Sequence, residues 1–125
     1  MNIQPVRFYI VDDDLSFGKS LKRLLNARGM SAAYFGSAQS FIDSVPPGQH
    51  GYAIVDINMP VCSGFGLMDR MREMNYRMPV IIITGQTQAD SRDIALQKGA
   101  LGFLQKPFSE ESLLELIKQG AEGSD

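Results

Sequence analysis

The segment Tyr52–Asp56 constrains the fold most, because an unbroken run of apolar, strand-forming residues ends abruptly on a carboxylate. Ser63 then opens a segment with helical spacing. A strand of this kind delivers one acid to the C-terminal edge of a sheet, where open α/β sheets bind their ligands. Two other apolar runs end in a similar way, one at Asp12–Asp14 and the other at Thr84. Three polar strand ends in one short chain predict a functional site at that edge.

The length and composition are those of one globular domain. The chain has 125 residues, of which 44% are hydrophobic and 21% charged, and its net charge of −2 gives no basic surface for nucleic acid. No secretory signal precedes the first strand, and no apolar run approaches the roughly 20 residues of a membrane span. We therefore expect a single cytoplasmic domain over residues 1–125, structured over about 5–120, with 121–125 a tail or the start of a linker. We expect it to bind neither a membrane nor nucleic acid directly.

Predicted strands and helices alternate strictly along the chain. The strands are expected at Val6–Val11, Met30–Phe35, Tyr52–Asp56, Val80–Ile83 and Leu101–Gln105. The helices are expected over about Leu15–Arg28, after Ser37, over Gly64–Met74 and Ala89–Lys98, and after Ser109. In the first helix, Leu21, Leu24 and Leu25 have the spacing of a buried stripe. This alternation predicts a parallel sheet with right-handed crossovers and helices on both faces.

The apolar content of the strands indicates their order in the sheet. Inner parallel strands are covered on both faces and are continuously apolar, whereas the second and fifth strands contain small or polar residues and suit the edges. The prediction is an α/β, doubly wound, five-stranded parallel sheet of order 2-1-3-4-5. Its switch point lies between the first and third strands, beside Asp12, Asp13 and Asp56.

These three carboxylates favour a hard cation. They repel one another when charged, and an all-oxygen cluster without His or Cys suits Mg²⁺. Lys106, at the end of the fifth strand, offsets one of the three negative charges. The remaining charge of −2 would be balanced by one Mg²⁺. A cis Lys106–Pro107 bond would aim its ammonium inward. Such a pocket can receive a phosphoryl group, for which a carboxylate is a sufficient nucleophile.

Four motifs occur in order along nearly the whole chain. They are Val11-Asp12-Asp13, Asp56-x-x-Met59-Pro60-x-x-x-Gly64, Ile83-Thr84-Gly85, and Gly99-Ala100-x-x-Phe103-x-x-Lys106-Pro107-Phe108. Jointly, they resemble the receiver domain of two-component response regulators. This resemblance implies a (βα)5, flavodoxin-like fold of the CheY type.

The resemblance also implies residue roles. Asp56 would be the phosphoacceptor, and Mg²⁺ would be bound by Asp13, Asp56 and the backbone carbonyl of Asn58, with Asp12 acting through water. Thr84 and Lys106 would hold the phosphoryl group, and Phe103 would rotate inward on activation. The side chains of Asn58 and Gln86 would tune the lifetime of the phosphoryl group.

The implied function is a signalling switch. The phosphoryl donor would be a histidine kinase or a histidine phosphotransfer protein. The switched surface, over the fourth helix, fifth strand and fifth helix, is a candidate homodimer face. The chain would not be an enzyme beyond self-phosphorylation and slow self-dephosphorylation. Its Ile-Thr-Gly and Gly-Phe-Leu-Gln-Lys-Pro-Phe segments are most similar to receivers joined to a helix-turn-helix DNA-binding domain.

Three alternatives remain open. A Mg²⁺-dependent phosphohydrolase acting through an aspartyl phosphate usually needs a second acid two residues after the nucleophile, and that position is Asn58. A scaffold that has lost phosphorylation would have no need of the intact acid set. A flavin-binding protein of the same topology is disfavoured because the predicted edge is acidic and lacks a Ser/Thr-rich phosphate loop.

Overall fold

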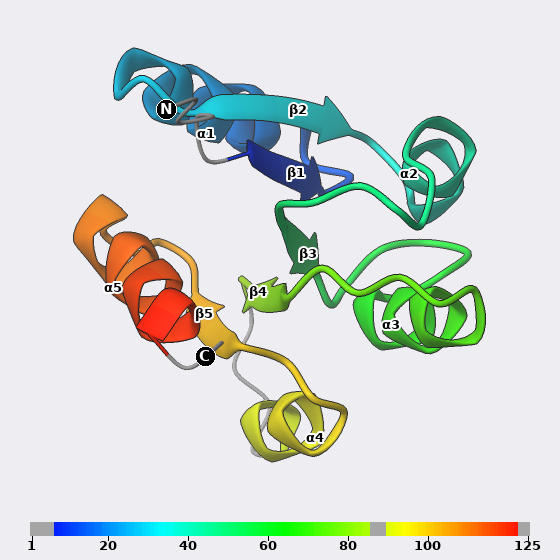
Figure 1. The fold of residues 1–125 in the computed structure, drawn as a ribbon. Helices are drawn as coiled ribbons and strands as arrows, with labels where there is room; N and C mark the ends of the chain where they lie inside the picture. The colour runs from blue at the N-terminus through cyan, green and yellow to red at the C-terminus, as the bar shows by residue number, and fades with distance from the viewer. Residues whose placement is uncertain (1–6, 86–89, 123–125) are drawn as a thin grey trace.

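The computed structural model describes residues 7–85 and 90–122, and these form five strands alternating with five helices (Figure 1). The strands are β1 (Arg7–Val11), β2 (Ser31–Phe35), β3 (Tyr52–Asp56), β4 (Val80–Thr84) and β5 (Gly102–Gln105). The helices are α1 (Leu15–Ala27), α2 (Ala38–Ser44), α3 (Gly64–Glu73), α4 (Ser91–Gln97) and α5 (Glu110–Glu122). Among the described residues, none of the helices has the length and hydrophobicity needed to span a bilayer.

Side-chain caps begin several of the helices where the sequence predicts them. Asp14 accepts a hydrogen bond from the Phe17 N–H, and Ser37 and Ser63 each accept one from the amide three residues later. At the start of α5, Ser109 Oγ accepts from the Ser112 N–H at 3.1 Å. Each cap satisfies an amide that the first helical turn cannot pair internally, which fixes where the helix begins.

The sheet is parallel throughout, in the predicted order β2-β1-β3-β4-β5. Its register brings the strand ends level, because Val11 pairs with Phe35 and Val55, and Asp56 pairs with Ile83. Parallel strands that end together expose their next residues along one edge. The residues after β1, β3, β4 and β5 therefore meet there.

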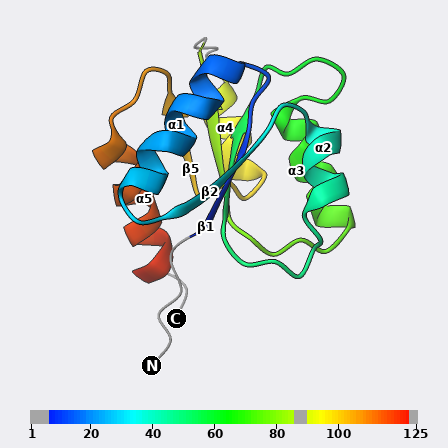
Figure 2. The same cartoon turned by 90° about the horizontal axis from the view of Figure 1, so that it is seen from above.

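The sheet separates two layers of helices, each with its own buried core (Figures 1 and 2). α1 and α5 cover one face, where Leu25 and Leu113 are fully buried against Ile54 and other strand residues. α2, α3 and α4 cover the other face, where Phe41 and Leu67 are fully buried. The predicted arrangement, with helices on both faces, is confirmed.

The structure differs from the sequence-based expectation in a few details. Leu24 does not belong to the buried stripe of α1, since it is 42% exposed. It lies on the flank of a helix whose buried positions are Gly18, Leu21 and Leu25. α5 continues to Glu122, slightly beyond the expected structured segment of about 5–120. The expected starts at Val6 and Ala89 lie outside the described residues.

α3 and α4 are tied together near their C-terminal ends. Arg72 Nη2 donates a hydrogen bond to the Lys98 carbonyl at 2.6 Å, and Lys98 Nζ forms an ion pair with Asp69 at 2.9 Å. The guanidinium thus caps a carbonyl at the end of α4, where a cation is electrostatically favourable.

Candidate functional site

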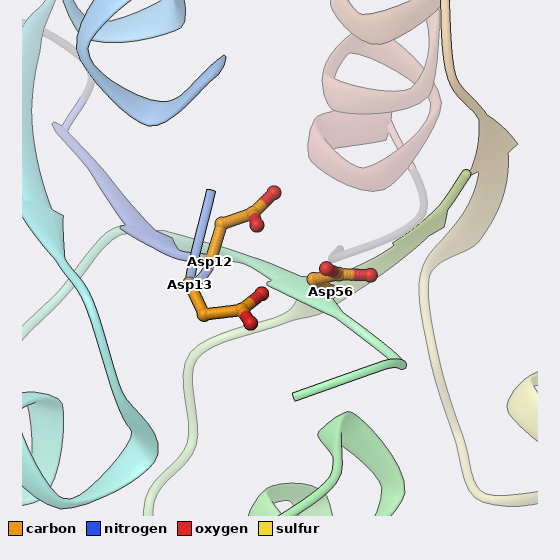
Figure 3. A group of neighbouring side chains, drawn as sticks. All are labelled: Asp12, Asp13 and Asp56. Carbon is orange, nitrogen blue, oxygen red and sulfur yellow. The ribbon is translucent and has the colours of Figure 1, made fainter. Parts of the chain in front are cut away.

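Three aspartates converge at the C-terminal edge of the sheet (Figure 3). Asp12 and Asp13 follow β1, and Asp56 is the last residue of β3. One carboxylate oxygen from each lies within 4.8 Å of the others. Asp12 and Asp56 are buried, whereas Asp13 is exposed and leaves the cluster open to solvent.

Asp12 is contacted through its main chain and through both carboxylate oxygens. Its N–H donates to the Phe35 carbonyl at 3.1 Å, and its own carbonyl accepts from the Tyr34 hydroxyl at 2.6 Å. Its Oδ1 accepts from the Asp14 N–H at 2.9 Å, and its Oδ2 forms an ion pair with Lys106 Nζ at 2.6 Å. Burial and the nearby charges of the acidic loop raise the pKa of Tyr34, so its phenol remains a donor at neutral pH.

Lys106 reaches the acids from the end of β5. Its backbone N–H donates to the Thr84 carbonyl at 2.7 Å, and the Lys106–Pro107 peptide bond is cis. Its Nζ lies 3.7 Å from Asp56 Oδ2, in addition to its closer contact with Asp12. The same ammonium lies 4.2 Å from the centroid of the Phe17 ring, a cation–π contact that places a cation over the electron-rich ring face.

The surroundings of Asp56 raise the pKa of its carboxyl group. Burial, followed by the charge of Asp12, raises its pKa from 3.8 to about 6. The Asn58 N–H, which donates to Asp56 Oδ1 at 3.2 Å, and the charge of Lys106 act in the opposite direction. Two close acids, one lysine and one amide therefore leave excess negative charge that favours protonation or a cation.

The loop after Asp56 packs tightly against the strand end. The Gly64 N–H donates to the Ile57 carbonyl at 3.0 Å, and a Cβ at Gly64 would overlap the Asp56 backbone carbonyl. A glycine is thus required where α3 begins. In the same loop, Asn58 Nδ2 donates to Thr84 Oγ1 at 3.2 Å, which connects the ends of β3 and β4.

The described residues thus place most of the predicted site together. Asp12, Asp13, Asp56 and Lys106 form one cluster, and Asn58 adjoins it. Thr84 is fully buried at the end of β4. Phe103 is partly buried and packs on the core beneath α2, α3 and α4. Gln86 lies outside the described residues.

Sequence reasoning missed two aromatic residues that contact the cluster. Tyr34 comes from β2, and Phe17 comes from the first turn of α1 and meets the Phe108 ring edge-on. Neither residue belongs to a recognisable motif. The register of β2 against β1 could have placed Tyr34 near Asp12. It could not have predicted that the Tyr34 hydroxyl reaches the Asp12 carbonyl.

The donor set fits a hard divalent cation. The oxygens of the cluster are all carboxylate, and their spacing suits direct and water-mediated contacts to an ion with Mg–O distances of about 2.1 Å. Asp12 Oδ2 is fully buried, and in the described structure only an ion pair reaches it, without the geometry of a hydrogen bond. It therefore retains unused acceptor capacity.

Comparison with known proteins identifies the family of the chain. The family model of the response regulator receiver domain matches residues 8–118. The transcriptional regulatory protein FixJ of Bradyrhizobium diazoefficiens is 34% identical over 110 residues, which cover 88% of this chain and 54% of that protein. The response regulator protein TmoT of Ectopseudomonas mendocina is 35% identical over 118 residues, covering 94% and 54%.

Solved structures resemble the whole domain. The crystal structure of FixJ-N superposes with a TM-score of 0.86 at 29% identity and covers 98% of both chains. The response regulator StyR also gives a TM-score of 0.86, at 33% identity, covering 95% of this chain and 60% of that one. The chain spans about half the length of the curated relatives it matches. From the family match over residues 8–118, the fold and these relatives, the chain belongs to the response regulator receiver domains of two-component systems.

Proposed function

We propose that Asp56 is the phosphoacceptor of this receiver domain and that its phosphorylation changes the surface of the domain. The observation that carries the proposal is the convergence of Asp12, Asp13 and Asp56, with oxygens within 4.8 Å, beside the Lys106 ammonium. Asp56 is the last residue of β3, and its carboxylate lies beside the other two acids and within 3.7 Å of the lysine ammonium, as a reacting group requires.

Mg²⁺ is the proposed cofactor. Asp13, Asp56 and the backbone carbonyl of Asn58 would bind it directly, and Asp12 would act through water. When bound, the ion neutralises excess negative charge and stabilises charge on the phosphoryl oxygens. Receiver domains typically bind Mg²⁺ at such an acidic pocket, and the described residues supply the oxygen ligands it prefers.

The proposed reaction is phosphoryl transfer to a carboxylate. An Asp56 carboxylate oxygen attacks the phosphorus of the donor, and a P–O bond forms as the bond from phosphorus to the donor's nitrogen or oxygen breaks. The leaving group departs with the electron pair of the broken bond, as a neutral imidazole after protonation or as acetate. Lys106 Nζ, 3.7 Å from Asp56 Oδ2, is placed to pair with a phosphoryl oxygen.

Thr84 and Phe103 would couple the reaction to the surface. Thr84 lies at the end of β4 and would shift toward the new phosphoryl oxygens, and the freed space would admit the Phe103 ring. The β4–β5 register pairs Ile82 with Phe103 and Thr84 with Gln105, so the two proposed residues are close neighbours along the sheet. A Thr84→Ala variant that phosphorylates and still changes its partner binding fully would contradict this coupling.

Receiver domains are in general not enzymes, and we infer only self-phosphorylation from small donors and slow self-dephosphorylation. Asn58 and Gln86 would tune the lifetime of the phosphoryl group by orienting water. The Asn58 side chain is exposed at the mouth of the cluster, which supports access to an attacking water.

The partners of receiver domains are histidine kinases or phosphotransfer proteins, which would donate the phosphoryl group here. A homodimer would use the α4–β5–α5 face, where Ile94 and Leu96 are exposed on α4. Relatives such as FixJ and TdiR are called transcriptional regulatory proteins, so the proposed output is control of transcription through a part of the protein beyond this domain. We propose no direct nucleic-acid contact by this domain.

Intact-mass spectrometry tests the proposal. After incubation with Mg²⁺ and acetyl phosphate, the wild-type chain should gain the mass of one phosphoryl group, and Asp56→Asn should gain none. EDTA should prevent the gain. Equal labelling of both proteins would place the modification elsewhere and contradict the assignment.

The phosphohydrolase alternative is not favoured. Asn58 occupies the position of the second acid that such enzymes use, and its amide is engaged with Thr84 rather than available as a proton donor to a leaving group. Sustained turnover of p-nitrophenyl phosphate, lost in Asp56→Asn, would reverse this conclusion.

A further inference from the structure

Asp13 is the acid of the cluster whose side chain has the least support. Its carboxylate is exposed, and within residues 7–85 and 90–122 it takes part in none of the hydrogen bonds or ion pairs that hold Asp12 and Asp56. Its direction is therefore set by the backbone, above all by the Asp12–Asp13 peptide group.

That peptide group is held from β2 through its carbonyl, because the Tyr34 hydroxyl donates to the Asp12 carbonyl at 2.6 Å. The preceding peptide group is also held from β2, since the Asp12 N–H donates to the Phe35 carbonyl at 3.1 Å. Because a peptide unit is planar, holding the Asp12 carbonyl also orients the N–H and Cα of Asp13. The bond from Tyr34 thus reaches the Asp13 side chain through the main chain.

α1 is shaped to admit the tyrosine. Gly18 is buried in this helix, and a Cβ built on it would overlap Cε1 and Cδ1 of the Tyr34 ring. Glycine is a poor helix former, so nothing local to the helix favours it at this position. The close approach of the ring explains why the position has no side chain.

We infer that Tyr34 is a positioning residue for the metal-binding acids, holding the Asp12–Asp13 peptide so that Asp13 faces Asp56, and that Gly18 provides the space for it. This inference rests on the proposed function, because it concerns the same Mg²⁺ site.

The test is Mg²⁺ affinity in Tyr34→Phe, which removes the hydroxyl and keeps the ring. NMR titration of the EDTA-stripped proteins, followed through the amides of Asp13, Asp14 and Asn58, gives the dissociation constant. We expect it to rise about five- to tenfold, the effect of one lost orienting hydrogen bond near a metal site. The Asp13 amide signal of the metal-free variant should also shift.

Tyr76→Phe is the matched control. The Tyr76 hydroxyl also donates to a backbone carbonyl, that of Val45, at 2.5 Å, but at the end of α2 away from the acids. Both variants should unfold at lower urea concentration than the wild type, whereas only Tyr34→Phe should lose Mg²⁺ affinity. A merely structural role for Tyr34 would lower stability and leave the affinity unchanged.

Gly18→Ala provides an independent approach, because its Cβ displaces the Tyr34 ring without altering the hydroxyl. It should weaken Mg²⁺ binding to a similar degree, and the double variant should be no weaker than either single variant, since both remove the same bond. Additive losses would contradict the shared cause.

The outcomes separate this inference from the proposed function. If the wild type binds Mg²⁺ and Asp13→Asn does not, but Tyr34→Phe binds within twofold of the wild type, the inference is wrong and the proposed function stands. If the wild type itself shows no Mg²⁺ binding, both are wrong.

Discussion

The carboxyl group of Asp56 is buried beside a second acid, and both circumstances oppose its ionisation. The arrangement is useful to a phosphoacceptor only if a cation offsets it, because the attacking form is the carboxylate. Without metal, the folded protein therefore contains an unfavourable charge at neutral pH.

This charge predicts how stability depends on pH. The folded-state pKa of Asp56, about 6, lies above its ordinary value of 3.8, so proton binding to Asp56 stabilises the folded state. This contribution to the free energy of unfolding is complete below pH 3.8 and is lost as pH rises through 6. In EDTA at pH 8, Asp56→Asn should be more stable than the wild type by on the order of 2 kcal/mol. This advantage should shrink as pH falls from 6 to 4.

Urea unfolding of both proteins at several pH values measures the difference. The exposed acid Glu115, changed to Gln, is the control and should show no comparable pH-dependent gain. A constant difference between wild type and Asp56→Asn from pH 4 to 8 would mean that the carboxyl is not perturbed.

Val61 combines two unfavourable properties in the loop beside the site. Its φ is 71°, a left-handed conformation that a β-branched residue rarely adopts, and its side chain is fully exposed. Val61→Asn should stabilise the protein by about 1 kcal/mol, since asparagine tolerates this conformation and no burial is lost. Val61→Thr keeps the branch and should give no such gain, and thermal unfolding compares the two.

At the scale of elements, α1 has one side that packs and one side that does not. Leu25 is fully buried against the sheet, whereas its neighbour Leu24 is 42% exposed. Consecutive residues of an α-helix are rotated by about 100° around its axis, so two adjacent leucines can have different surroundings.

This contrast predicts unequal costs for the same substitution. Leu25→Ala should lower the free energy of unfolding by about 3 kcal/mol, through lost burial and a residual cavity. Leu24→Ala should cost less than about 1 kcal/mol. Urea unfolding checks both, and similar costs would contradict the packing described for α1.

The elements were largely predictable, for a physical reason. Apolar runs ending at Asp12, Asp56 and Thr84 required strands buried on both faces, and caps such as Ser37 marked helix starts. The exposure of Leu24 was not predictable, because a periodic pattern defines a stripe only to within one flanking position.

At the scale of the molecule, the acid cluster was predictable because a parallel sheet brings its strand ends to one edge. The contributions of Tyr34 and Phe17 were not, because they depend on how far a side chain reaches across a helix or strand. The positioning role of Tyr34 follows only from the structure, in which its ring occupies the space that a side chain at Gly18 would fill.

The proposed cation should stabilise the whole domain. Binding to the folded state alone, at a hundredfold excess over its dissociation constant, adds about 2.7 kcal/mol. The melting temperature should therefore rise with Mg²⁺ and fall back with EDTA, and Asp13→Asn should abolish the rise. KCl at equal ionic strength is the control, and an equal rise with KCl would indicate screening instead of binding.

The hydrogen bond from Arg72 to the Lys98 carbonyl and the Lys98–Asp69 ion pair attach the C-terminal end of α4 to α3. A rigid helix that is attached at one end moves most at its other end. We therefore expect any displacement of α4 on phosphorylation to be larger at Ser91, the first residue of the helix, than at Lys98, the residue that caps its end. Arg72→Ala removes this hydrogen bond and should make the displacement more nearly equal at the two ends of α4.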